Sequence, residues 1–138
     1  MAPLAVMVLL ALGGAVVCVL IDWGHLQLVK ADLQTAADVA ARAGVKSLPN
    51  LFGARTAAVR AARERVADGL PVDLYEGDVE AGTFTPDVGF TPDATPVNAI
   101  RVTLRRTSGT GNAVHFAIGS AVGVKDADIE AQAVATTQ

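Results

Sequence analysis

The chain has 138 residues and a net charge of −3, and 51% of its residues are hydrophobic although only 4% are aromatic. Its length allows one small domain plus a separate N-terminal segment, and the mild charge predicts no nucleic-acid partner. The single cysteine excludes an internal disulfide. The sequence has no phosphate-binding glycine loop and no zinc-protease motif, so we expect neither an enzyme nor a cofactor.

An uncharged apolar run fills residues 2–21. Twenty residues of helix span roughly 30 Å, which is enough to cross the hydrocarbon core of a membrane. No Lys or Arg precedes the run, and the next charge is Asp22. We interpret this as the result of cleavage of a basic leader before Met1. The alternative is that Met1 is the true start and the topology signals are weak.

A helical apolar stripe continues beyond the run. No proline lies between Ala5 and Leu48, so we predict one helix that ends near Lys46 and is stopped by Pro49. Such a helix is about 65 Å long, so its second half must pack on another part of the chain. The predicted division is a transmembrane or filament-core helix over residues 1–46 and a head over residues 47–138. The stripe consists of Leu26, Val29, Leu33, Ala36, Ala37, Ala40 and Gly44.

The rest of the chain predicts an α+β head with one or two helices and a roughly three-stranded antiparallel sheet. We expect a second helix from Leu51 to Asp68 that Gly69 ends. Its apolar side should contain Ala58, Val59, Ala62 and Val66. The predicted strands are residues 78–84, 97–107 and 129–137, of which the last two alternate apolar and polar side chains.

Two segments between these strands are assigned from composition. Ala113 to Val122 reads as a short apolar helix. Residues 83–94 contain two similar five-residue segments, TFTPD and GFTPD. The prolines in them, Pro86 and Pro92, argue against a central strand. We therefore predict an exposed, turn-rich loop there.

Polar and reactive residues near the end of the apolar run are candidates for function. Asp22 and His25 are one helical turn apart, but a metal site would need a third ligand. A carboxylate at the end of an apolar helix must find water or a cation, so we predict that Asp22 pairs with a basic group of a neighbouring subunit. Trp23 serves either as a membrane-interface anchor or in helix packing. Cys18 is interpreted as a buried free cysteine rather than a lipidation site.

Two clusters of charged residues in the head are interpreted as solvent-exposed surface. The acidic residues of 73–93 lack the regular spacing of a calcium loop. The arginines of the second predicted helix could touch anionic lipid or a partner, but a solvated face needs no such function.

The segment LIDWGHLQLVKADLQTAADVAARAGV (residues 20–45) places Asp22 and Gly24 directly after the apolar run, then Leu33–Gln34, and then Ala36–Ala37–Asp38 three to four helical turns after the first pair. Two segments near the C-terminus are also informative, namely NAIRVTLRRT (98–107) and DIEAQAVAT (128–136). With these features the chain resembles the TadE/TadG-like proteins of the tight-adherence (Flp) pilus system.

This resemblance implies a pilin-like or pseudopilin subunit with an inner-membrane helix before assembly and an extracytoplasmic head. The implied partners are further copies of the chain in an extracellular filament, the inner membrane, the pilus secretion machinery and a prepilin-type peptidase. Small residues along the helix would allow close helix approach in the filament. The expected assembly residues are Gly13, Gly14, Asp22, Trp23, Leu26, Val29, Leu33, Ala36, Ala37 and Ala40.

Two other functions remain open at this point. The chain could be a membrane-anchored minor pilin or pilus assembly factor that forms no bulk polymer. It could also be a surface adhesion or binding module, with Phe84 and Phe90 contacting a ligand or surface.

Overall fold

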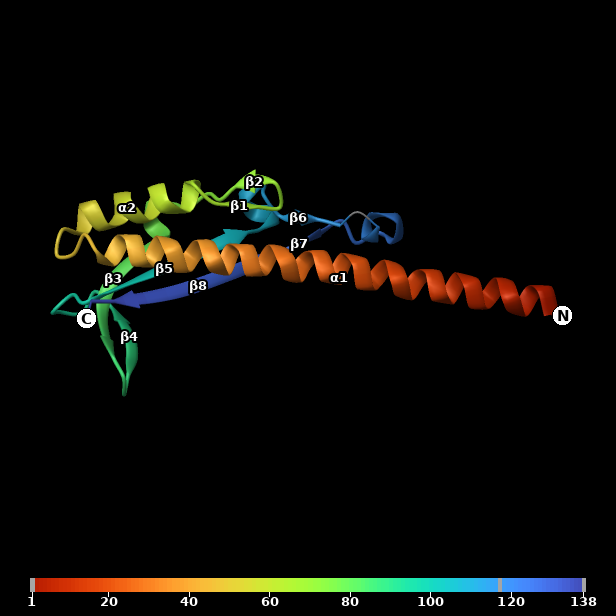
Figure 1. The fold of residues 1–138 in the computed structure, drawn as a ribbon, viewed down its shortest axis with the longest axis horizontal. Helices are drawn as coiled ribbons and strands as arrows, with labels where there is room; N and C mark the ends of the chain where they lie inside the picture. Colours follow the sequence, from red (N-terminus) through yellow and green to blue (C-terminus); the bar gives the residue numbers. More distant parts are fainter. Residues whose placement is uncertain (1, 117, 138) are drawn as a thin grey trace.

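The computed structural model describes residues 2–116 and 118–137. A 44-residue helix, α1 (Ala2–Val45), runs beside an α+β head and extends beyond it toward the N-terminus (Figure 1). The α+β class and the single long helix predicted from the sequence are confirmed. The helix passes through Gly13 and Gly14 without a break.

The second helix, α2 (Leu51–Arg63), packs closely against the C-terminal part of α1. Its first turn is capped by Asn50, whose side-chain oxygen accepts a hydrogen bond from the Gly53 N–H at 3.0 Å. The packing is close because Gly44 has no side chain: a Cβ there would lie 3.2 Å from the Ala54 carbonyl oxygen. The buried side of α2 is a stripe of three alanines at four-residue spacing, Ala54, Ala58 and Ala62.

The predicted extension of α2 to Asp68 is wrong. After Arg63 the chain forms a small hairpin of β1 (Val66–Ala67) and β2 (Leu70–Pro71). Its two turn residues, Asp68 and Gly69, both have positive φ angles (53° and 71°), which suits the Asp-Gly pair. Gly69 therefore marks a hairpin turn and not a helix end. Val66, predicted to be on the apolar side of the helix, is exposed.

The main sheet has four antiparallel strands in the order β4-β3-β5-β8. The three predicted strands are present, and β4 is an additional edge strand. Three short 3-10 helices connect these elements: η1 (Glu76–Asp78), η2 (Ser108–Thr110) and η3 (Gly119–Val122). The strands of the sheet are β3 (Val79–Thr85), β4 (Gly89–Pro92), β5 (Ala99–Arg106) and β8 (Ile129–Thr136).

The predicted loop over residues 83–94 is instead the β3–β4 hairpin, in which Phe84 pairs with Phe90 across the strands. Proline is tolerated because β4 is at the edge of the sheet and Pro92 is its last residue. Gly82 permits the pairing, since a Cβ there would collide with the Thr91 carbonyl.

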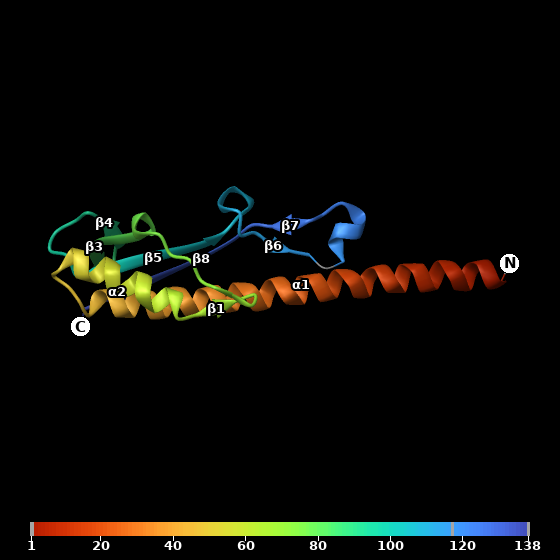
Figure 2. The same cartoon turned by 90° about the horizontal axis from the view of Figure 1, so that it is seen from above.

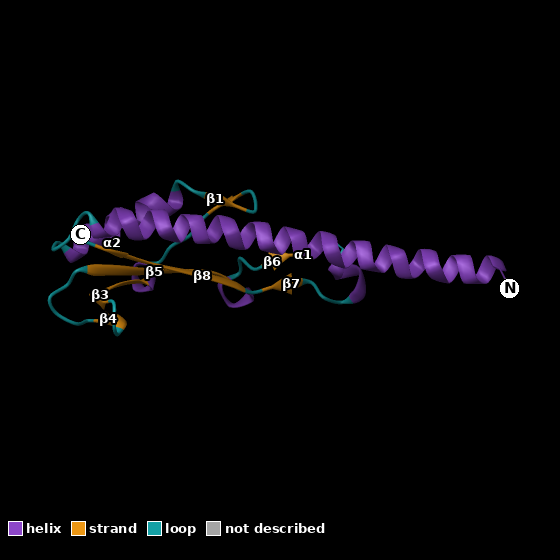
Figure 3. Cartoon of the chain, turned by 60° about the horizontal axis from the view of Figure 1, so that its bottom comes forward, coloured by secondary structure: helices purple, strands orange, loops and turns teal. Residues whose placement is uncertain are grey.

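The core lies between the sheet and the second half of α1. Figure 3 shows α1 lying along the sheet, close to β5 and β8. The predicted alternation is confirmed in β8, where Ile129, Ala131 and Ala133 are buried and the residues between them are exposed. In β5 the residues predicted to face inward are buried, but Thr103 on the predicted outer face and Arg106 are buried as well. The second half of α1 is thus a structural part of the head, which accounts for its length. The side chains that meet in this core include Val29, Leu33, Ile100, Val102, Leu104, Ile129 and Ala131.

A narrow ribbon leaves the far end of the sheet and runs beside α1 toward the N-terminus (Figures 1 and 2). It consists of β6 (Val114–His115) and β7 (Asp126–Ala127), which are antiparallel, with η3 at its tip. We call its described residues, 114–116 and 118–127, the β6–β7 arm. The helix predicted over Ala113–Val122 is wrong for the start of the segment, where Val114–His115 pair with β7, but Gly119–Val122 form the short 3-10 helix η3. The chain then reverses at Gly123, whose φ is +91°.

Candidate functional site: the uncovered apolar helix and its polar border

The N-terminal half of α1 is an apolar rod with almost nothing packed on it. Leu4, Met7 and Leu10 are each about 70% exposed, at 70%, 72% and 70%. Among the described residues, α1 is the one helix long and apolar enough to cross a membrane, and its most apolar window is not buried inside the fold. Because water solvates such a surface poorly, lipid or protein must cover it.

Two polar residues at the end of this rod connect the helix to two different ribbons of the head. Asp22 Oδ2 accepts a hydrogen bond from the Gly119 N–H at 2.7 Å, at the tip of the β6–β7 arm. His25 Nε2 lies 3.0 Å from Asp68 Oδ1 in the β1–β2 turn. The two side chains thus have separate partners. In the described part of the chain, no three His, Cys, Asp or Glu residues are grouped to hold a metal ion.

This geometry gives Asp22 a partner within its own chain. The predicted pairing with a basic group of a neighbouring subunit stays a prediction, and such a group would have to share the carboxylate with Gly119. The direct effect of this hydrogen bond lies within the chain. It holds the tip of the arm at the level along α1 where the apolar run ends.

An apolar groove of about 220 Å³ lies between α1 and the arm tip. Trp23 is on its rim and is 60% exposed. The arm side of the groove is formed by Phe116, Gly119 and Val124, and the helix side by Val19, Asp22, Trp23 and Leu26.

Apart from Asp22, Trp23 and Leu26, which line this groove, the expected assembly residues fall into two groups. Around Gly13 and Gly14 there is open space, with no atom within 4 Å of a Cβ built there. The second group is buried in the head, so its side chains contact the sheet and α2 and are not free to touch another subunit. Any effect of this group on assembly would act through the fold of the head. Its members are Val29, Leu33, Ala36, Ala37 and Ala40.

The two phenylalanines named as a surface contact lie on the β3–β4 hairpin, far from the apolar rod. Phe84 is 37% exposed. The Arg101 guanidinium lies 4.6 Å from the centre of the Phe90 ring and also pairs with Glu80 at 2.6 Å. Phe90 is therefore part of a side-chain stack on the sheet, and Phe84 is the more accessible of the two.

Some of the acids predicted to form a solvated surface pair with arginines on the same sheet. Arg105 lies 2.8 Å from Asp78 and 3.1 Å from Glu130. The hydrogen bond from Arg105 to Glu130, with the nearby charge of Asp78, raises the pKa of Arg105 above its usual value. Glu130 is the cross-strand partner of Arg105, whereas Asp78 approaches Arg105 from η1.

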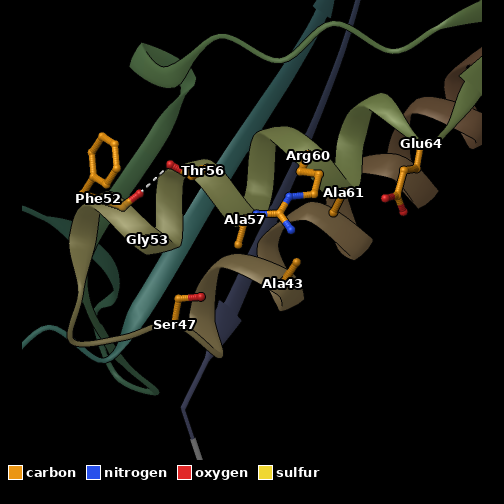
Figure 4. Close-up of a pocket in the computed structure, with 9 residues that line it drawn as sticks. All are labelled: Ala43, Ser47, Phe52, Gly53, Thr56, Ala57, Arg60, Ala61 and Glu64. Carbon is orange, nitrogen blue, oxygen red and sulfur yellow. Dashed lines mark hydrogen bonds between the residues drawn. The ribbon is translucent and has the colours of Figure 1, made fainter.

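A second groove, of about 570 Å³, lies on the surface along α2 and beside the end of α1 (Figure 4). Small residues, including Ala43, Gly53 and Ala57, form much of its wall, and Arg60 lies across it. Neither histidine of the chain lines this groove, and its one carboxylate is Glu64.

The arm and its contact with α1 could not be found from the sequence. Asp68–Gly69 is a recognisable hairpin signal, and it could have been used to find the β1–β2 ribbon. The arm segment is a short apolar stretch, for which periodicity does not separate helix from strand. The hydrogen bond that positions it joins residues 97 apart in sequence, so no local pattern encodes it.

We expect Asp22→Ala to loosen the arm tip without unfolding the head. A hydrogen bond to a charged acceptor contributes about 1.5–3 kcal/mol, which corresponds to roughly 10- to 150-fold faster amide exchange at Gly119. Hydrogen–deuterium exchange of the chain in detergent micelles would measure this. The control is Asp38→Ala, since Asp38 is an exposed carboxylate on the same helix. Unchanged exchange at Gly119 in Asp22→Ala would show that this contact does not hold the arm.

Comparison with known proteins identifies the N-terminal third of the chain. Residues 1–47 match the family model described as putative Flp pilus-assembly TadE/G-like. This agrees with the resemblance seen in the sequence and places the apolar rod and its polar border inside the matched segment. No curated protein and no solved structure shows significant similarity to the chain.

Proposed function

We propose that this chain, whose residues 1–47 carry a TadE/G-like pilus-assembly domain, is a structural pilin-like subunit that polymerises into a filament through α1. The observation that carries the proposal is the uncovered apolar half of α1, continuous with a second half that is built into the head. In the membrane, lipid covers the apolar surface. In the filament, the same surface is covered by the helices of neighbouring copies.

The rigid joint between helix and head supports this function. Because Leu33 and its neighbours on α1 are core residues, the head cannot turn freely about the helix. A polymer repeats one contact between identical subunits, so each subunit must present its helix and head in a fixed relation. Transfer from lipid to polymer exchanges one apolar environment for another and requires no bond chemistry from the subunit.

The location and partners follow from the same proposal. The chain would lie in the inner membrane of the cell envelope before assembly and in an extracellular filament afterwards, where it could take part in adhesion. Its partners would be further copies of itself, the pilus secretion machinery and a prepilin-type peptidase. No cofactor enters this mechanism.

The deciding experiment is to shear cells that produce the chain, pellet the supernatant and image the pellet. Mass spectrometry of the pellet identifies the chain and its N-terminal peptide. We expect thin filaments in which this chain is the main component. Confinement of the chain to the membrane fraction would overturn polymerisation and favour a membrane-anchored minor pilin or assembly factor.

A further inference from the structure

We propose that the tip of the β6–β7 arm is a second membrane contact, which inserts into the lipid interface beside α1. This inference rests on one part of the proposed function, namely that α1 crosses a membrane. It adds a lipid-binding surface that lies 97 residues from Asp22 in sequence and outside the segment matched to the pilus-assembly family.

The depth of the tip follows from its contacts with the helix. If residues 2–21 fill the hydrocarbon layer, Val19 is only about 3 Å inside its boundary, because each residue rises 1.5 Å. The arm residues Phe116, Gly119 and Val124 line a groove together with Val19. The hydrogen bond from Gly119 to Asp22 holds the tip at this level. The tip is therefore placed at the membrane boundary and cannot stay in bulk water when α1 is inserted.

The chemistry of the tip suits the lipid interface. Val124 is 53% exposed, and beside it on the helix is Trp23, an aromatic residue of the kind enriched at this depth. Lys125 follows Val124 and is exposed, so it can meet lipid phosphate. The acid nearest on the arm, Asp126, pairs with His115 on the opposite strand. Apolar side chains with one adjacent cation, and with Asp126 engaged by His115, suit an anionic lipid surface.

The backbone of the tip is also prepared for an apolar environment. The Val124 N–H donates to the Gly119 carbonyl at 3.0 Å, and the Phe116 N–H donates to the Lys125 carbonyl at 3.0 Å. The Gly119 N–H is taken by Asp22. Since unpaired backbone groups are costly away from water, these bonds allow the tip to enter the interface.

The test measures the depth of single fluorescent labels in vesicles. The only native cysteine is removed with Cys18→Ala, and one new cysteine is then introduced by Val124→Cys for labelling with NBD. Leu12→Cys is the control inside the apolar run, and Asp87→Cys is the control on the exposed β3–β4 turn. The full chain is reconstituted into phosphatidylcholine–phosphatidylglycerol vesicles with a nitroxide either near the lipid headgroup or deep in the acyl chain.

We expect the label at position 124 to be quenched by the shallow nitroxide about as strongly as an interfacial probe, and on the order of fivefold more than the label at position 87. The label at position 12 should respond most to the deep nitroxide. Quenching at position 12 without quenching at position 124 would overturn the arm contact and leave membrane anchoring intact. No quenching at either position would overturn both.

A neighbouring subunit is the competing occupant of the tip, and the same samples distinguish it. Burial by a second copy would shift the NBD emission at position 124 to the blue without lipid quenching, and the shift would grow with the protein-to-lipid ratio. That result would overturn the lipid contact. Quenching that is independent of this ratio would support it.

Discussion

Leu33→Ala is expected to lower the free energy of unfolding of the head by about 2–5 kcal/mol, the usual cost of truncating a buried leucine. Leu33 is on α1 but is only 1% exposed, and it is among the largest fully buried side chains of the chain. Small domains have a total stability of about 5–15 kcal/mol, so this single change on the helix should remove a large share of it. Urea unfolding in mild detergent, followed by circular dichroism, measures the loss.

The same substitution at another leucine of the same helix is the control. Leu28 is 62% exposed, so Leu28→Ala should change the free energy of unfolding by less than about 0.5 kcal/mol. Equal losses in the two variants would contradict the packing of this face of α1 on the sheet. If the expected difference is found, a lower filament yield for Leu33→Ala would be explained by the destabilised fold of the head and not by a lost contact between subunits.

The sequence predicted those parts of the fold that have a clear local period. The stripe through Leu33 gave the face of α1 that packs on the head, and the alternation through Val102 and Ala131 gave the inward faces of β5 and β8. These elements are long enough for the apolar pattern to repeat several times. The resemblance to the pilus-assembly family came from these same elements, namely residues 20–45 of the helix and the segments 98–107 and 128–136, and the family model matches the first of them within residues 1–47.

The errors lie in short segments whose structure depends on distant partners. The β4 strand forms because Gly82 allows the Thr91 carbonyl to approach closely. Pro92 does not prevent this pairing, because it is the last residue of a strand at the edge of the sheet. The arm exists because its two strands pair with each other and because Asp22 holds its tip. The sequence singled out Asp22 as a residue in need of a partner, but the partner it has in the structure is a backbone N–H.

The apolar rod presents a different problem, because the single chain leaves it uncovered and its environment decides its role. The structure narrows the assembly prediction to the exposed residues. Gly13 and Gly14 remain candidates for close helix contact, since their surroundings are open, whereas the alanines of the second half are already buried. The role of the two glycines can therefore be tested without disturbing the head.

Gly14→Leu is expected to reduce the yield of sheared filaments by tenfold or more, on the order of the 1.4 kcal/mol that one close helix contact can supply. Membrane insertion should not fall, because leucine is more apolar than glycine and stabilises a helix by roughly 0.5–1 kcal/mol relative to it. Fractionation of cells measures insertion, and shearing followed by quantitative mass spectrometry measures assembly.

Ala5→Leu adds similar bulk to the same apolar run. By helical periodicity it lies about 180° around the helix from Gly14, so it should leave the yield of filaments nearly unchanged. Equal loss of insertion and assembly in Gly14→Leu would contradict transfer of the helix from lipid to polymer, because the defect would then precede assembly. Loss of assembly alone, confined to the glycine face, would show that neighbouring helices approach most closely there, where open space surrounds the glycine in the single chain.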